Sequence, residues 1–158
     1  MSWDDHHLEA FRRSVSKVIL KHEPNSFLSE LLTGMEVDIE VGGSARLDDT
    51  DLYDLPWAGQ ITRAILRSDG LSDSANLYEL SRILELTLIV AGTDFDDSDV
   101  SDFSRAIVNL ETLKQLKIIV EPAALDFVKT RLSWPQDELI YSIETKGGHR
   151  SKGRGKKP

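Results

Sequence analysis

A long apolar segment of the chain reads Leu77-Tyr78-Glu79-Leu80-Ser81-Arg82-Ile83-Leu84-Glu85-Leu86-Thr87-Leu88-Ile89-Val90. Leucines at positions 77, 80, 84 and 88 are three or four residues apart, which places them on one face of an α-helix. Ile83, Leu86, Ile89 and Val90 fill much of the remaining surface. Because a helix that is apolar on nearly all sides belongs inside a domain, this segment predicts a central helix over residues 74–90.

Apolar residues continue at helical spacing on both sides of this segment. Val100, Phe103 and Ile107 begin the buried stripe of a helix predicted over 98–117. The run Ile118-Ile119-Val120 that follows either ends this helix or forms a short strand. Pro122 suits the first position of another helix, because proline at that position loses no hydrogen bond. The remaining helices are predicted over residues 4–22, 26–32, 57–67, 122–132 and 139–143.

One segment has a different period. Residues 36–41 alternate acidic and apolar side chains, which is typical of a strand with one buried and one exposed face. Gly42-Gly43 is a plausible turn, so a small β-hairpin is predicted over about residues 36–47. No internal repeat of fixed period is recognised. The predicted fold is mainly α, a single domain of six or seven helices with this hairpin and a disordered basic tail at the C-terminus.

Charge divides the chain into two parts. The 158 residues carry 19 basic and 27 acidic side chains, for a net charge of −8. Six of the basic residues and none of the acidic ones lie in residues 146–158. We therefore predict an acidic domain over residues 1–145 and a basic tail over 146–158, which has no apolar residue to bury and should be disordered when free.

The acidic domain suggests binding to another protein. A strongly acidic surface favours a partner with a basic patch and repels phosphate backbones. The leading hypothesis is a non-enzymatic adaptor, inhibitor or assembly subunit that binds its partner through an acidic helical surface. Self-association is a related possibility, with the tail of one copy lying on the body of another. The candidate protein-binding residues are Trp3, Glu36, Asp38, Glu40, Asp51, Asp54 and Trp134.

The basic tail supports an alternative. Arginine and lysine among glycines can bind RNA or DNA phosphates as an electrostatic arm of a nucleic-acid-associated or packaging protein. The tail has no aromatic residue for base stacking, so such binding would be weak and salt-dependent. A solubilising terminus, or an arm that rests on the acidic body of its own or a neighbouring copy, is the favoured explanation of this composition. The candidate nucleic-acid-binding residues are Lys146, Arg150, Lys152, Arg154, Lys156 and Lys157.

Catalytic and metal-binding chemistry has little support in the sequence. Asp94, Asp96 and Ser98 match the start of a calcium loop, but Asp99 and Arg105 replace its required glycine and glutamate. Helix capping by residues 97–99 explains this cluster more simply. Residues 48–54 lack the glycine-rich loop that would accompany a magnesium-phosphate site. We therefore predict no enzyme activity, cofactor or bound metal, with a metal-dependent hydrolase as a minor alternative.

Two further features concern the compartment. The chain contains no cysteine, which favours cytosol-like redox conditions. Its first residues lack the charged and apolar regions of a secretory signal, and no stretch approaches about 18 consecutive apolar residues. We expect a cytoplasmic protein with no membrane partner.

Overall fold

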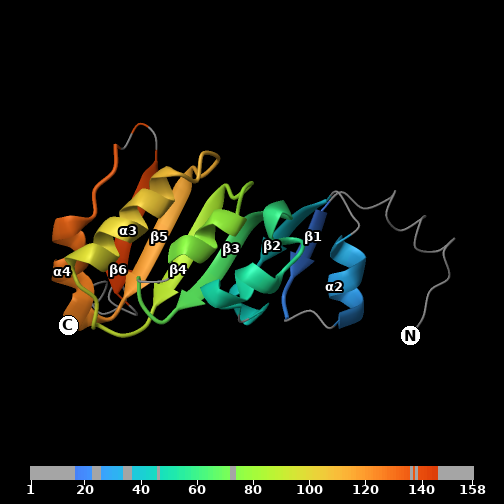
Figure 1. Ribbon diagram of the computed structural model, residues 1–158, viewed down its shortest axis with the longest axis horizontal. Coiled ribbons are helices and arrows are strands. Elements are labelled where there is room, and N and C mark those ends of the chain that lie inside the picture. Colours follow the sequence, from blue (N-terminus) through green and yellow to red (C-terminus); the bar gives the residue numbers. More distant parts are fainter. Residues whose placement is uncertain are drawn as a thin grey trace, which may run out of the picture.

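The computed structural model describes residues 17–22, 26–33, 37–45, 47–71, 74–135, 137 and 139–145. These residues form a parallel sheet of six strands, and the order of strands in the sheet is their order in the chain (Figure 1). Each of the four inner strands is therefore hydrogen-bonded to the strands before and after it in the sequence, and β1 and β6 are the edge strands. The strands are β1 Lys17–Leu20, β2 Asp38–Val41, β3 Ile61–Ser68, β4 Glu85–Val90, β5 Gln115–Val120 and β6 Ile140–Thr145.

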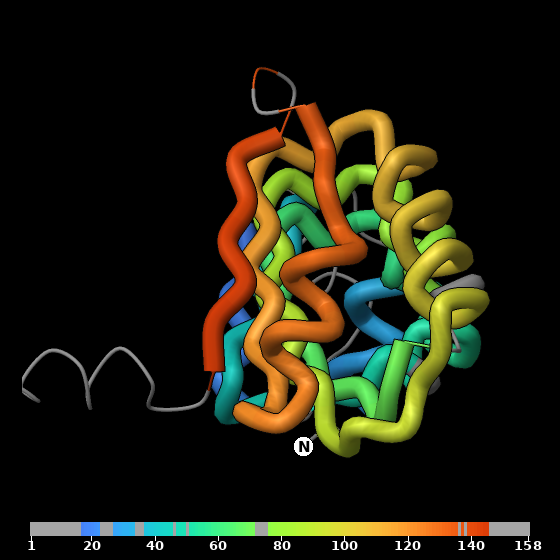
Figure 2. Tube along the Cα trace, turned by 90° about the vertical axis from the view of Figure 1, so that its left-hand side faces the viewer, coloured from blue at the N-terminus to red at the C-terminus, as the bar shows by residue number. Residues whose placement is uncertain are grey.

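The described helical segments that connect the strands lie on one side of this sheet (Figure 2). Parallel neighbours need a crossover, and crossovers are almost always right-handed, so a sheet built in chain order receives its helices on a single face. Figure 2 shows this arrangement, with the strands at the left and the helical segments at the right. The α-helices are α2 Ser26–Thr33, α3 Asp97–Val108 and α4 Leu125–Arg131. The 3₁₀ segments are η1 Gly43–Ala45, η2 Asp49–Asp54, η3 Ala58–Gln60, η4 Ser74–Glu79 and η5 Pro122–Ala124.

A repeated leucine pattern underlies the sheet. Residues 80–90 have the pattern Leu-x-x-Ile-x-x-Leu-x-Leu-x-Val, and residues 110–120, which begin 30 residues later, have Leu-x-x-Leu-x-x-Leu-x-Ile-x-Val. Every specified residue of both segments is buried. Residues 58–68 repeat the pattern with smaller side chains, as Ala-x-x-Ile-x-x-Ala-x-Leu-x-Ser, and all five of these are buried as well.

The spacing within this pattern follows from the backbone. Leu80 N–H donates to Leu77 O at 3.0 Å, and Ile83 N–H donates to Leu80 O at 3.4 Å, so successive three-residue turns return a side chain to the same side. From Leu86 onward the chain is extended, and every second side chain points inward. The strands start 21 to 30 residues apart. The unit resembles a leucine-rich repeat, although Ala91 and Glu121 occupy the position where that repeat has Asn or Cys.

The strand register stacks the inward side chains into rows. Leu66, Leu88, Ile118 and Ile143 are register neighbours in one such row, and Ala64, Leu86, Leu116 and Tyr141 form the next. These rows pack under the helical segments in a hydrophobic core that extends from Leu20 to Leu139. Repeats that stack on their neighbours in this way bury a continuous core, which is the organisation of a solenoid.

The prediction of a mainly α fold is wrong, and the predicted central helix shows why. Residues 74–90 form η4, two tight turns and then β4. In this segment the buried residues are first three residues apart and then two apart. Many of its apolar residues are consequently three or four positions from one another, which is also the spacing of one face of a helix. Leu84 distinguishes the two structures, because a helix would bury it beside Leu88, yet it is 41% exposed.

The same imitation explains the other incorrect elements. Residues 61–67 of the predicted helix 57–67 belong to β3, and the predicted helix 98–117 ends at Val108 and is followed by β5. Residues 140–143 of the predicted helix 139–143 belong to β6. Within the predicted helix 4–22, residues 17–20 form β1, while residues 1–16 lie outside the described part of the chain.

The β-hairpin predicted over residues 36–47 is also wrong. Its first half is a strand, but β2 pairs in parallel with β1 and β3, and Gly43–Ala45 is a 3₁₀ turn rather than the start of a return strand. Two helix predictions are confirmed, because α2 covers residues 26–33 and η5 with α4 covers residues 122–131. The predicted tail, 146–158, lies outside the described residues.

Candidate protein-binding face

Within the described residues, one face of the sheet has no helix over it. Because the helical segments all cover the other side, the outward side chains of β1 to β6 remain at the surface (Figure 2). We call these outward side chains the open face. One row of these side chains follows the register across all six strands, at the first residues of β4, β5 and β6, and is here called the cross-sheet row. The cross-sheet row consists of Ile19, Glu40, Arg63, Glu85, Gln115 and Ile140.

Charges of opposite sign alternate along the first part of this row. Lys17 Nζ lies 2.8 Å from Glu40 Oε2, and Arg63 approaches Glu40 at 3.9 Å and Glu85 at 3.0 Å. The carboxylate of Glu40 lies between the two cations, and its side chain is only 18% exposed. Exposed ion pairs contribute little to stability, about 0–1 kcal/mol each. Their main consequence here is that charges of both signs lie side by side on the open face.

Two hollows lie beside this row. One, of about 290 Å³, is lined by outward residues of β4, β5 and β6, among them Glu85, Thr87 and Lys117. The other, of about 270 Å³, extends over β1 to β4 and includes Glu40, Gly42, Glu85 and Thr87 in its lining. Glu85 and Thr87 border both hollows, so the two adjoin at β4, and we call the pair of adjoining hollows the trough. Six strands about 4.8 Å apart give this trough a length of about 24 Å.

Both ends of the cross-sheet row are apolar. Ile19, on the edge strand β1, is 56% exposed, and Ile140, on the edge strand β6, is 66% exposed. Large aliphatic side chains this exposed lose contact with water only when something covers them. The open face therefore has a charged centre, with an exposed isoleucine at each end of the trough.

The structure separates the sequence-predicted protein-binding residues. Asp38 and Glu40 lie on the open face, where Asp38 accepts a hydrogen bond from Arg82 at 2.9 Å. Asp51 and Asp54 belong to η2, which lies on the helical side. Trp134 is in the core and only 6% exposed, so its ring is not at a surface that a partner reaches. Trp3, Glu36 and the six basic residues of the tail lie outside the described residues.

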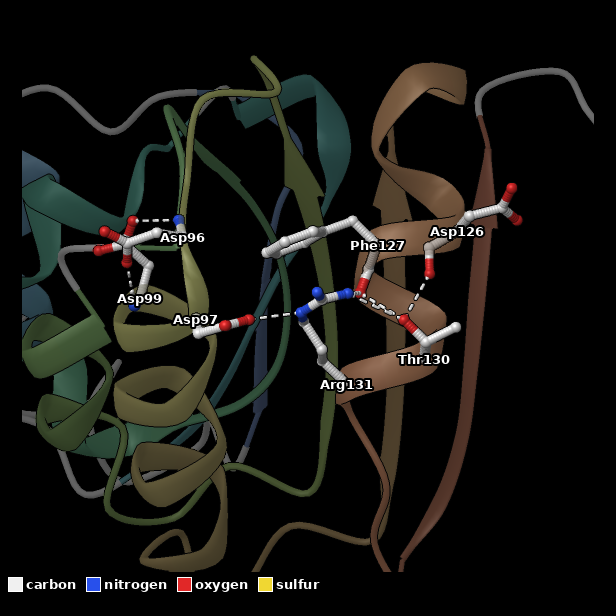
Figure 3. Close-up of polar contacts among 7 residues, drawn as sticks. All are labelled: Asp96, Asp97, Asp99, Asp126, Phe127, Thr130 and Arg131. Carbon is white, nitrogen blue, oxygen red and sulfur yellow. Dashed lines mark hydrogen bonds and ion pairs between the residues drawn. The ribbon is translucent and has the colours of Figure 1, made fainter.

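The acidic segment before α3 has structural partners. The Asp96 side chain accepts from Asp99 N–H at 3.0 Å, and the Asp99 side chain accepts from Asp96 N–H at 2.9 Å. This reciprocal arrangement is a capping box, and Figure 3 shows it at the first turn of α3. The N-cap is therefore Asp96, one residue before the segment 97–99 from which the sequence predicted it.

A neighbouring contact ties α3 to α4. Arg131 Nε donates to Asp97 Oδ1, and the guanidinium lies 3.8 Å from the centre of the Phe127 ring (Figure 3). Arg131 also donates to Phe127 O at 3.2 Å, within its own helix. The carboxylate of Asp97 thus joins α3 to α4. Within the described residues, no group of three or more His, Asp or Glu side chains is arranged to hold a metal ion.

Most residues of the open face were not singled out by the sequence. Arg63, Glu85, Thr87, Gln115 and Lys117 lie in segments predicted to be helical, and their common orientation appears only in strands. The signal that could have found them is the alternation in residues 85–90 and 115–120, where every second residue is buried.

The repeated leucine pattern and the parallel sheet describe a short repeat protein, with helical segments on one side of the sheet and the open face on the other (Figure 2). The chain matches no family model, and no curated protein or solved structure is significantly similar to it. No helix in the described part of the chain is long and apolar enough to cross a membrane.

Proposed function

We propose that this protein is a non-enzymatic protein-binding module that takes its partner on the open face of the sheet. The observation that carries the proposal is the trough across β1 to β6, bordered by charges of both signs and ended by two exposed isoleucines. Repeat proteins of this organisation offer extended surfaces for binding. The absence of cysteine from the sequence supports the cytoplasm as the compartment.

The open face fits a protein better than a small molecule. Its hollows are shallow stretches of one trough, and small-molecule sites are usually enclosed and mostly apolar. The face also mixes both signs of charge, with Arg63 and Lys117 beside Glu40 and Glu85. A phosphate backbone would meet two carboxylates at the centre of the trough, which disfavours a nucleic acid there.

The acidic helical side is a weaker site than the open face. Asp96, Asp97, Asp99 and Asp102 all make hydrogen bonds or ion pairs within the protein. These carboxylates serve capping, an ion pair within α3 and the packing of α3 against α4, whereas the paired carboxylates Glu40 and Glu85 lie among the outward side chains that line the hollows of the open face. We accordingly retain the sequence hypothesis of a protein-binding function and move the binding surface from the helical side to the sheet.

The partner surface follows from the chemistry of the trough. It should present apolar side chains near both ends of a span of about 24 Å, with charged groups of both signs between them. Association should weaken as salt rises, because Arg63 and Lys117 are exposed.

A photo-cross-linking residue placed on each side of the protein tests this proposal. We expect benzoylphenylalanine at position 87, on the open face, to cross-link a partner protein in the cells that make this chain. The matched control is the same residue at position 101, which is exposed on α3 on the helical side. Adding Lys117→Glu to the position-87 variant should reduce the cross-linked product. Cross-linking at position 101 but not at position 87 would contradict the proposal.

A further inference from the structure

We propose that the open face binds a second copy of this chain, packed about a twofold axis that runs parallel to the strands between β3 and β4. This inference rests on the proposed function and names its partner. Such an axis lays β1 of one copy over β6 of the other, β2 over β5, and β3 over β4. It brings each cross-sheet row against the same row of the partner, read in the opposite direction.

The cross-sheet row is complementary to its own reverse. In chain order it reads Ile, Glu, Arg, Glu, Gln, Ile, and in reverse it reads Ile, Gln, Glu, Arg, Glu, Ile. Arg63 of one copy then faces Glu85 of the other, twice, and Glu40 faces Gln115. Ile19 faces Ile140 at both ends, so the two exposed isoleucines of each copy are covered by those of the other. No charge in the row faces a like charge.

The neighbouring row supports the same arrangement. It contains the register neighbours Ile65, Thr87, Lys117 and Ser142, and Gly42, the residue after β2, lines the hollow beside Ile65 and Thr87. The proposed axis sets Lys117 opposite Gly42 of the other copy. Gly42 has no side chain and borders the hollow that Glu40 and Glu85 also line. Lys117 makes no ion pair with any described residue of its own chain. In the dimer its ammonium group can enter this hollow beside two carboxylates.

The area of the face predicts a weak dimer. A face about 24 Å across and about 20 Å along the strands buries about 1,000 Å² when both copies are counted. This area is near the lower limit for specific association, so we expect a reversible equilibrium between monomer and dimer.

Charge reversal of the two facing residues tests the geometry. Arg63→Glu sets a carboxylate at position 63 against Glu85 of the other copy, and Glu85→Arg sets a guanidinium at position 85 against Arg63. Each variant alone should therefore dimerise at least about tenfold more weakly than wild type. In a mixture of the two variants, a heterodimer places opposite charges at the reversed positions if position 63 of one copy faces position 85 of the other. In the double variant, a homodimer restores both pairs of opposite charges. Sedimentation equilibrium over a concentration series measures the dimer dissociation constant of the wild type, of both single variants, of their mixture and of the double variant. Circular dichroism checks that each variant is folded.

In a homodimer of either single variant, both facing pairs join like charges, two carboxylates in Arg63→Glu or two guanidiniums in Glu85→Arg. In the heterodimer, the reversed positions 63 and 85 face each other as one pair of opposite charges, and the unchanged Glu85 and Arg63 face each other as the other. We therefore expect dimers of the wild type, of the mixture and of the double variant, and monomers of each single variant. A strictly monomeric wild type, or single variants that dimerise as well as wild type, would overturn the inference. Failure of the mixture to dimerise, when both variants are folded, would overturn it too.

The proposed function is tested separately from this inference. Cross-linking of a different protein at position 87 can be observed whether or not the chain self-associates. A cross-linked product of twice 17.7 kDa identifies the second copy.

Discussion

Replacing Leu88 with alanine is expected to lower the free energy of unfolding by about 2–5 kcal/mol. Leu88 lies in the middle of β4 with 2% of its surface exposed, and its register neighbours on both sides, Leu66 and Ile118, are buried as well. Removing its side chain leaves a cavity between three strands. Leu84→Ala is the matched control, and we expect it to cost less than about 1 kcal/mol because that side chain is largely outside the core.

Urea denaturation of the two variants measures this difference. Both leucines lie on the same face of the helix that the sequence predicts, so a helical segment would lose comparable stability from either substitution. Similar losses for Leu84→Ala and Leu88→Ala would therefore contradict the strand. An unchanged dependence of the unfolding free energy on urea would show that both variants unfold from the same native state.

The second large effect is expected at Trp134. Its ring makes edge-to-face contacts with Phe103, at 6.4 Å between centroids, and with Tyr141, at 5.0 Å. These contacts join α3 to the last strand of the sheet. Trp134→Ala should therefore lower the free energy of unfolding by about 3–5 kcal/mol, whereas Trp134→Phe, which keeps an aromatic ring there, should lose clearly less.

This pair of variants also separates two roles of the tryptophan. A residue that contacts a partner from the surface costs little stability when it is truncated in the free protein. Thermal or urea unfolding of the isolated chain decides between the roles. If Trp134→Ala unfolds like the wild type, its place in the core is contradicted.

The sequence predicted the helices that have clear end signals. Pro122 marks the start of η5 and α4, and α2 ends at Thr33, just before Gly34. It also predicted correctly that Ile39 and Val41 are buried while Asp38 and Glu40 point outward. The strict alternation of acidic and apolar residues in that segment is not a pattern that a helix would also produce. Each of these predictions depends on residues that are close in the chain.

The strands could not be recovered in the same way. Leu77, Leu80 and Ile83 follow three-residue turns, and Leu86, Leu88 and Val90 follow an extended chain, so together they resemble a helix. The repeat that would have revealed this is obscured by connections of unequal length, because α3 adds residues between β4 and β5 that the other connections lack. Strand starts are consequently spaced by 21 to 30 residues rather than by a constant period.

The open face depends on the register between strands. Arg63 meets Glu40 and Glu85 only because β2, β3 and β4 are parallel and adjacent, and the Asp38–Arg82 hydrogen bond joins residues 44 positions apart. Residue types alone show that such charges exist without showing which of them meet. The sequence-predicted carboxylates Asp38 and Glu40 were therefore part of the face, while their basic partners were not recognised.

Disulfide formation between engineered cysteines tests the parallel sheet and its open face most directly. The natural chain contains no cysteine, so Thr87→Cys with Lys117→Cys introduces a single pair, at positions that are register neighbours on β4 and β5. Neighbouring strands hold their Cα atoms within the range of about 4.4–6.8 Å that a disulfide spans. Under mild oxidation of dilute protein we expect this pair to close within one chain, and the pair Thr87→Cys with Ser101→Cys, whose second position is on α3, to remain reduced. Equal behaviour of the two pairs, or closure of the second alone, would contradict the structure from which the function is inferred.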